Sequence, residues 1–296
     1  MSKQGMMKEQ TLLSPVATTV IGPQEVALMA LVLVPAVWIL CLSFSRKRRR
    51  RRKLMRAINH PDWFPWPDHY EHILRENIPL ASELSERQQR RLRSLILFFI
   101  KDKRFEACGG LEGITDTMRV VIAAHACLLL LNHHHDCFPN LRSILVYPSR
   151  YFADDENGDR QERLGESWGT GSVVLAWDST LNDAWNPDDG LNVAIHEFAH
   201  QLDQATGGAD GLPSLRHTGN RVAGWARVLG GAYDNFLDKV DRGRPSSIDD
   251  YGATDPAEFF AVATETFFEK PDQLRREYPS LYEELTVFYA VDLAES

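Results

Sequence analysis

The spacing of hydrophobic residues divides most of the chain into amphipathic helices and a few short strands. In several segments apolar residues recur every three or four positions, which is the periodicity of a helix with one buried face. The pattern predicts helices at residues 82–101, 115–131, 188–205, 219–240, 256–269 and 279–291. Short apolar runs predict strands at 141–147 and 172–177. The expected architecture is therefore an α+β domain that is mostly helical and has a small sheet.

Polar and glycine-rich stretches separate these elements. They predict loops at 153–171 and 206–220. Residues 59–79 are rich in proline, tryptophan and histidine and are expected to form an irregular segment that leads into the domain. We expect this domain to cover residues 59–296.

An uncharged apolar run sets the beginning of the chain apart. Residues 26–44 are long enough to cross a bilayer as a helix, and residues 46–53 are all lysine or arginine. A cleaved signal peptide would carry its positive charge before the apolar core, and basic residues beside a membrane span tend to stay in the cytoplasm. The sequence therefore predicts a single-pass anchor in a bacterial inner membrane. Residues 1–25 would form an outside tail and residues 45–58 a basic juxtamembrane segment, with the domain in the cytoplasm.

Charge and cysteine content narrow the classes of partner. The net charge is −8, and without the eight residues of the basic run the chain holds 25 basic against 41 acidic residues. Such an acidic body does not favour direct binding to nucleic acid. The basic run itself is a weak candidate for nucleic-acid binding because it directly follows the apolar segment. The four cysteines have no metal-ligand spacing and indicate free thiols in a reducing compartment.

The chemistry of the chain is concentrated in an HExxH sequence formed by His196, Glu197 and His200. On the predicted helix 188–205 the two histidines lie on one face, one turn apart, so both can bind one metal ion. Apolar neighbours indicate a buried helix, where two unpaired imidazoles and a carboxylate would be costly without a metal. The pattern indicates one Zn²⁺ per chain, with Glu197 beside a water on that ion, and hence metal-assisted hydrolysis.

A catalytic zinc site takes three protein ligands, so one ligand must come from another segment. Asp255-Pro256 predicts the start of a helix, on which Glu258 and Glu265 share one face two turns apart. Spacing alone leaves the third ligand open between these two glutamates, with Glu269 and Asp255 less favoured. Asp255 and Glu258 also fit a capping box, which gives Glu258 a structural alternative.

Asp203 follows His196 by seven residues on the same helix face. In that position it can accept a hydrogen bond from the outer nitrogen of a ligand histidine and so fix the orientation of the ring. The alternative is a structural bond to the loop that follows the helix.

Several motifs together resemble the Mlc titration factor A family of metallopeptidases. They are His196-Glu-Phe-Ala-His200-Gln-Leu-Asp203, Asp210-Gly-Leu-Pro213, Tyr251…Asp255-Pro-Ala-Glu258-Phe-Phe-Ala261 and the upstream segment from Gly165 to Asp178. The likeness covers about residues 55–290. It implies a zincin-like fold and a zinc peptidase of the gluzincin type, similar in its active site to the catalytic domain of anthrax lethal factor. Well-known members lack an N-terminal anchor, so this chain departs from them there.

The resemblance also implies roles for individual residues. Glu258 would be the third ligand and Tyr251 would stabilise the transition state. Glu265 would then be a candidate to contact a ligand side chain rather than the metal itself. Glu197 would act as general base on the water. A peptide or protein substrate would lie extended beside an edge strand, for which 172–177 is the candidate.

A second function follows from the resemblance alone. Family members sequester a DNA-binding repressor of glucose uptake genes, so binding such a repressor is the alternative to a peptidase role. Aminopeptidase activity is one candidate specificity, and the sequence does not decide between it and endopeptidase activity.

Overall fold

The computed structural model describes part of the chain, namely residues 65–131, 137–154, 160–168, 171–215 and 222–294, with the single positions 31, 38, 45, 49 and 52. The chain divides into two compact units, Met1–Arg48 and Arg49–Ser296, and all the elements below belong to the second. Among the described residues no helix is both long and apolar enough to cross a membrane. The predicted tail, anchor and basic segment at 1–58 lie outside the described residues apart from those single positions.

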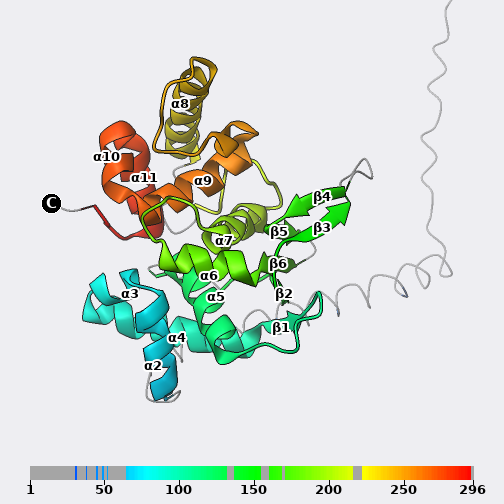
Figure 1. Ribbon diagram of the computed structural model, residues 1–296. Coiled ribbons are helices and arrows are strands. Elements are labelled where there is room, and N and C mark those ends of the chain that lie inside the picture. Colours follow the sequence, from blue (N-terminus) through cyan, green and yellow to red (C-terminus); the bar gives the residue numbers. More distant parts are fainter. Residues whose placement is uncertain are drawn as a thin grey trace, which may run out of the picture. The chain divides into compact units, whose positions relative to one another are not determined.

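The strands include a four-stranded mixed sheet (Figure 1). Its order is β1-β2-β6-β5, where β1, β2 and β6 are parallel and β5 is antiparallel to β6. The strands are β1 (Arg104–Ala107), β2 (Ser143–Tyr147), β6 (Ser172–Ala176) and β5 (Gly165–Trp168). The central strands β2 and β6 are rich in Val, Ile and Leu, as is usual where both faces of a parallel sheet are covered. The α+β prediction is confirmed.

Strand β6 is not the edge strand, so that prediction for 172–177 is wrong. It pairs with β2 on one side and with β5 on the other, and β1 and β5 are the edge strands of the described sheet. The stretch predicted as a loop at 153–171 contains β5 and also β4 (Arg160–Arg163), which pairs with β3 (Tyr151–Asp154) in a hairpin. These strands have four residues each and no apolar alternation, so only their pairing partners reveal them.

Helices predicted from periodicity appear close to their expected positions. The expected helices correspond to α4 (Glu86–Asp102), α5 (Asp116–Leu128), α7 (Val193–Asp203), α8 (Val222–Asp241), α9 (Pro256–Glu269) and α11 (Pro279–Tyr289). Four shorter helices were not predicted: α2 (Asp68–Asn77), α3 (Leu80–Glu83), α6 (Trp177–Trp185) and α10 (Pro271–Glu277). The segment 59–79 is thus partly helical, because α2 buries Leu74 and packs on α5.

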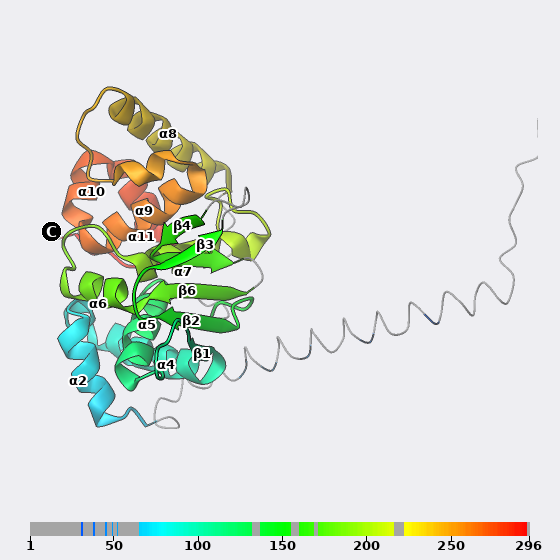
Figure 2. The same ribbon diagram turned by 45° about the vertical axis from the view of Figure 1, so that its right-hand side comes forward.

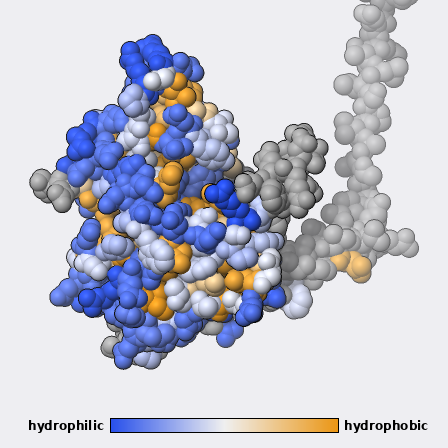
Figure 3. Space-filling view, in the orientation of Figure 1, coloured by the Kyte–Doolittle hydropathy of each residue, from blue (hydrophilic) through white to orange (hydrophobic). Residues whose placement is uncertain are grey.

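Helix α7 lies between the sheet and the C-terminal helices (Figure 2). It packs against β5 and β6 on one side and against α9 on the other. Most residues of α7 and all but two of α9 are buried, which reflects their apolar sequences. The surface shown in Figure 3 is mostly hydrophilic, with hydrophobic residues scattered over it. The fold therefore brings two buried helices from distant parts of the sequence side by side.

Candidate active site

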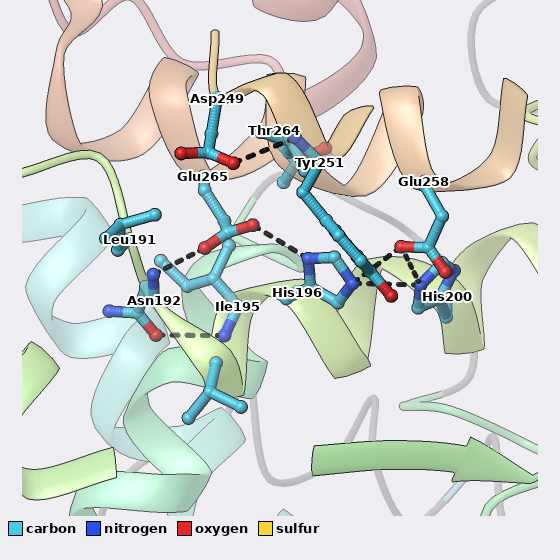
Figure 4. A network of polar contacts seen from close by, with 12 residues as sticks. Leu191, Asn192, Ile195, His196, His200, Asp249, Tyr251, Glu258, Thr264 and Glu265 are labelled. Carbon is cyan, nitrogen blue, oxygen red and sulfur yellow. Dashed lines mark hydrogen bonds and ion pairs between the residues drawn. The ribbon is translucent and has the colours of Figure 1, made fainter. Parts of the chain in front are cut away.

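Two histidines of α7 and one glutamate of α9 converge on a single point (Figure 4). Oε2 of Glu258 lies 3.0 Å from Nε2 of His196 and 3.3 Å from Nε2 of His200. The two Nε2 atoms are 3.1 Å apart. Asp255 caps α9 by accepting from the N–H groups of Ala257 and Glu258, so Glu258 sits in the first turn with its side chain free to face α7.

Glu265 lies on the opposite side of the His196 ring. Its Oε1 is 2.7 Å from Nδ1 of His196, and its Oε2 accepts from the backbone N–H of Asn192. Asn192 is the N-cap of α7, and its side chain accepts from the N–H of Ile195. The two glutamates left open by their spacing therefore meet opposite nitrogens of one ring.

The electrostatics of this cluster depend on burial and on the carboxylates. Burial disfavours charge on His196, but Glu265 and Glu258 outweigh it and raise the pKa of the imidazole well above its usual value. Burial also opposes ionisation of Glu258, yet hydrogen bonds from both histidines lower its pKa to about 2. The arrangement needs a positive charge at its centre.

These residues fit a metal ion. The three ligand atoms lie within 4.8 Å of one another and comprise two imidazole nitrogens and a carboxylate oxygen, which is a donor set typical of catalytic zinc. With Nδ1 of His196 donating to Glu265, the lone pair on its Nε2 faces Glu258, and only a proton or a cation between them makes that contact favourable. The described residues thus hold the elements of a three-ligand metal site.

Glu197 is almost completely buried beside this cluster. Burial raises its pKa to about 7, although His196 and His200 act in the opposite direction. A β-carbon added at Gly165 would lie 2.6 Å from Oε1 and 2.7 Å from Cγ of Glu197. The edge strand β5 therefore packs directly on this side chain, and a β-carbon at position 165 would force Glu197 and Val193 to shift. Gly165 begins one of the segments that resemble the family, but a glycine in a polar strand carries no sequence signal of which side chain packs on it.

Tyr251 approaches the cluster from the other side. It belongs to the short 3-10 helix Asp250–Ala253, which the side chain of Asp249 caps by accepting from the N–H of Tyr251. Its ring centroid lies 6.0 Å from that of His196, and its side chain extends toward His196, His200 and Glu258 (Figure 4). The residue is 57% exposed, so a bound molecule can reach it.

Asp203 is buried at the end of α7. One of its oxygens accepts from the N–H of Gly211 at 2.9 Å, which ties the helix end to the loop that follows. That Asp203 accepts a hydrogen bond from a ligand histidine stays a prediction.

Comparison with known proteins agrees with the geometry. The family model of the glucose-regulated metallo-peptidase M90 family matches residues 45–290. The chain belongs to this family. Membership supports a metallopeptidase, and His196, His200 and Glu258 are the described residues that are placed to hold its metal ion.

Individual relatives cover most of the chain. The uncharacterized protein slr2042 of Synechocystis is 36% identical over 255 residues, which are 79% of this chain and 91% of the relative. Mlc titration factor A of Klebsiella pneumoniae strain 342 is 36% identical over 226 residues, or 73% of this chain and 83% of that protein. The protein of the same name from Salmonella gallinarum is 34% identical over 252 residues, or 81% and 90%. The resemblance seen in the motifs is confirmed.

Proposed function

We propose that this protein is a zinc peptidase in which Glu197 is the general base. The observation that carries the proposal is the convergence of two imidazole nitrogens and Glu258 on one point beside the buried carboxylate of Glu197. His196, His200 and Glu258 would hold the ion, and Glu265 would keep His196 in the tautomer that presents Nε2. A bound zinc ion would supply Lewis acidity and make its water a nucleophile near neutral pH.

The remaining steps belong to side chains of the chain itself. Glu197 takes the proton of the attacking water and passes it to the leaving amine, for which a pKa near 7 is well suited. Tyr251 donates a hydrogen bond from its hydroxyl to the oxygen that gains negative charge. The exposure of this tyrosine leaves it within reach of a bound substrate.

The substrate would lie extended along β5. This strand has a partner on one side only within the described part of the sheet, and Gly165 places it against Glu197. A peptide that adds a strand to such an edge uses main-chain hydrogen bonds, which are independent of sequence. This supports peptides rather than small amides or esters as the substrate class.

The test is replacement of the general base. Glu197→Gln keeps the size of the side chain but cannot take a proton, so hydrolysis of a peptide library should disappear while zinc content stays at one per chain. Glu283→Gln on the exposed side of α11 is the matched control and should keep full activity. Turnover that survives in Glu197→Gln would refute this role.

A second candidate function rests on the relatives' printed name. Mlc titration factor A is named for titrating Mlc, and we propose binding of a DNA-binding repressor as the alternative for this chain. The Glu197→Gln variant separates the two, because a sequestering protein keeps its cellular effect without hydrolysis. Loss of the cellular effect in that variant would favour the peptidase.

A further inference from the structure

The register of β5 shows which of its backbone groups face away from the sheet. The N–H of Ala176 donates to the carbonyl of Leu164, which makes these two residues a hydrogen-bonded pair of the antiparallel ladder. Hydrogen-bonded and non-hydrogen-bonded pairs alternate along such a ladder. Gly165 and Ser167 are therefore in non-hydrogen-bonded pairs, and their N–H and C=O groups point to the free edge. These are the groups with which an added strand would pair.

One of these outward backbone groups already accepts a hydrogen bond within the protein. Nε2 of Gln204 donates to the backbone carbonyl of Ser167 at 3.3 Å. The hydroxyl of Ser167 donates to Oε1 of the same glutamine at 3.3 Å, and Gln201 donates to that hydroxyl at 2.7 Å. Gln204 thus lies across the edge of β5 and is held there from both ends of its amide.

The occupied carbonyl lies at a defined distance from the expected chemistry. Gly165 abuts Glu197, so the bond to be cut would lie close to Gly165. Ser167 is two residues further along the strand, which is about 7 Å. Gln204 therefore blocks the edge about two substrate residues away from that bond, on one flank only.

We propose that Gln204 determines specificity by limiting how far an extended peptide pairs with β5. This rests on the peptidase function proposed above. A peptide that ends near Gly165 gains the same main-chain bonds with or without Gln204. A peptide that continues past Ser167 on that flank must compete with the amide of Gln204 for the carbonyl. The wild-type protein consequently favours substrates that are short on that flank.

The test compares peptides of increasing length on the wild-type protein and on Gln204→Ala. The panel extends one reactive core by one to four residues, first on its N-terminal and then on its C-terminal side. The freed carbonyl gains a hydrogen bond from the long peptides, so kcat/KM for them should rise about 3- to 10-fold on one flank. This gain should come through KM with kcat unchanged, because the contact is the same in ground and transition states.

Two further variants separate this role from a structural one. Gln204→Glu keeps the side-chain length but has no N–H to donate, so it should show the same length-dependent gain. Gln273→Ala removes an exposed glutamine of α10 and is the matched control, which should leave the length profile unchanged. If both Gln204 variants alter all peptides equally, or lower activity on all of them, Gln204 only supports packing and the proposal is wrong.

Binding separates failure of this proposal from failure of the peptidase function. The dissociation constants of the same peptides are measured on Glu197→Gln and on Glu197→Gln with Gln204→Ala. If the wild-type protein cleaves no peptide but the double variant binds long peptides more tightly, the peptidase function fails and the role of Gln204 stands. If affinity does not depend on length in either protein, the role of Gln204 is refuted whatever the activity.

Discussion

His196 is the residue at which the geometry of the site is decided. One ring contacts Glu258 through Nε2 and Glu265 through Nδ1, and the two carboxylates come from positions two turns apart on the same helix. Since Nδ1 of His196 is engaged by Glu265, the lone pair available for a metal is on Nε2. A glutamate that lies on the Nε2 side is a ligand candidate, whereas one on the Nδ1 side can act only through the ring.

Metal affinity should distinguish the two glutamates. Glu258→Gln removes a charged ligand and should lose most of the bound zinc. Glu265→Gln removes only the negative charge that contacts Nδ1 of His196 and should weaken zinc binding by about 10- to 100-fold. Competition with a chelator of known affinity measures both. Zinc retained in Glu258→Gln and lost in Glu265→Gln would reverse the assignment.

Gly165 should control the position of Glu197. A methyl group at this position would lie under 3 Å from Cγ of Glu197 and from Cγ2 of Val193, so the carboxylate must move. Because small displacements of a catalytic group are costly, Gly165→Ala should lower kcat by about 100-fold while zinc content is unchanged. Gly113→Ala, at a glycine with open space around it, is the control. Wild-type kcat in Gly165→Ala would show that the strand yields instead.

At the scale of elements, α7 and α9 are joined by polar contacts at the N-terminus of α7 as well as by the contacts among His196, His200 and Glu258. The side chain of Asn192 donates to Oε1 of Glu269 at 2.9 Å and contacts Nε2 of the buried His125 at 3.3 Å. Its backbone N–H donates to Glu265. One residue therefore caps the helix that carries the histidines and links it to α9 and α5.

The stability of this contact should depend on pH through Glu269. Burial raises the pKa of Glu269 to about 9 from 4.5, although the bond from Asn192 acts against this. The folded chain then holds a proton that the unfolded chain loses above its lower pKa, so this group makes stability fall as pH rises from about 4.5 to about 9. Glu269→Gln cannot ionise and should melt about 3 °C or more above wild type at pH 8, with a smaller gap at pH 5.

Thermal melts at both pH values measure this gap. Glu112→Gln, at an exposed loop position, is the control, and its difference in melting temperature from wild type should not grow with pH. A Glu269→Gln variant that is less stable than wild type at pH 8 would show that the carboxylate form is needed.

At the scale of the catalytic unit, the ligand set joins two groups of elements. Helix α7 belongs to the side that carries the sheet, and α9 belongs to the C-terminal helices (Figure 1). An ion bound by His196, His200 and Glu258 would therefore cross-link segments that are about 60 residues apart in the sequence. Binding to the folded chain alone stabilises it by mass action.

Removal of the metal should consequently destabilise the whole unit. With free zinc at 100 times its dissociation constant the stabilisation is about 2.7 kcal/mol, so a chelator should lower the melting temperature by about 5–10 °C. In Glu258→Gln the chelator should have little effect. Equal melting temperatures with and without bound zinc in the wild-type protein would contradict a cross-linking role.

Residues 26–53 are the basis of a proposal about where the whole molecule is located. On the basis of the apolar run 26–44 and the basic run 46–53, we propose a single-pass inner-membrane protein with its catalytic unit in the cytoplasm. The full chain should stay in the membrane pellet after an alkaline carbonate wash. A high-salt wash is the control, and release by salt alone would show a peripheral protein held by its basic residues.

The site could be predicted from sequence where its residues are close together in the chain. The i, i+4 spacing of His196 and His200 places both rings on one helix face, and the apolar neighbours of that helix bury it. The second helix was equally predictable, since Asp255-Pro256 starts it and its apolar run sustains it. The short polar strands, which include β5, could not be predicted. The pairing of a four-residue strand depends on its neighbours in the sheet, and its own sequence does not indicate which strands these are.

The sequence by itself determined two buried helices, one with His196, Glu197 and His200 and one with several glutamates. Helical periodicity places Glu258 and Glu265 on one face, so it could not say which of them meets Nε2 and which meets Nδ1. The packing of α9 across α7 decided that, as the pairing of β5 decided which strand presents a free edge beside Glu197. Periodicity indicates in which direction a side chain points from the axis of its own helix. The distance between the axes of two helices is set by the packing of the rest of the chain.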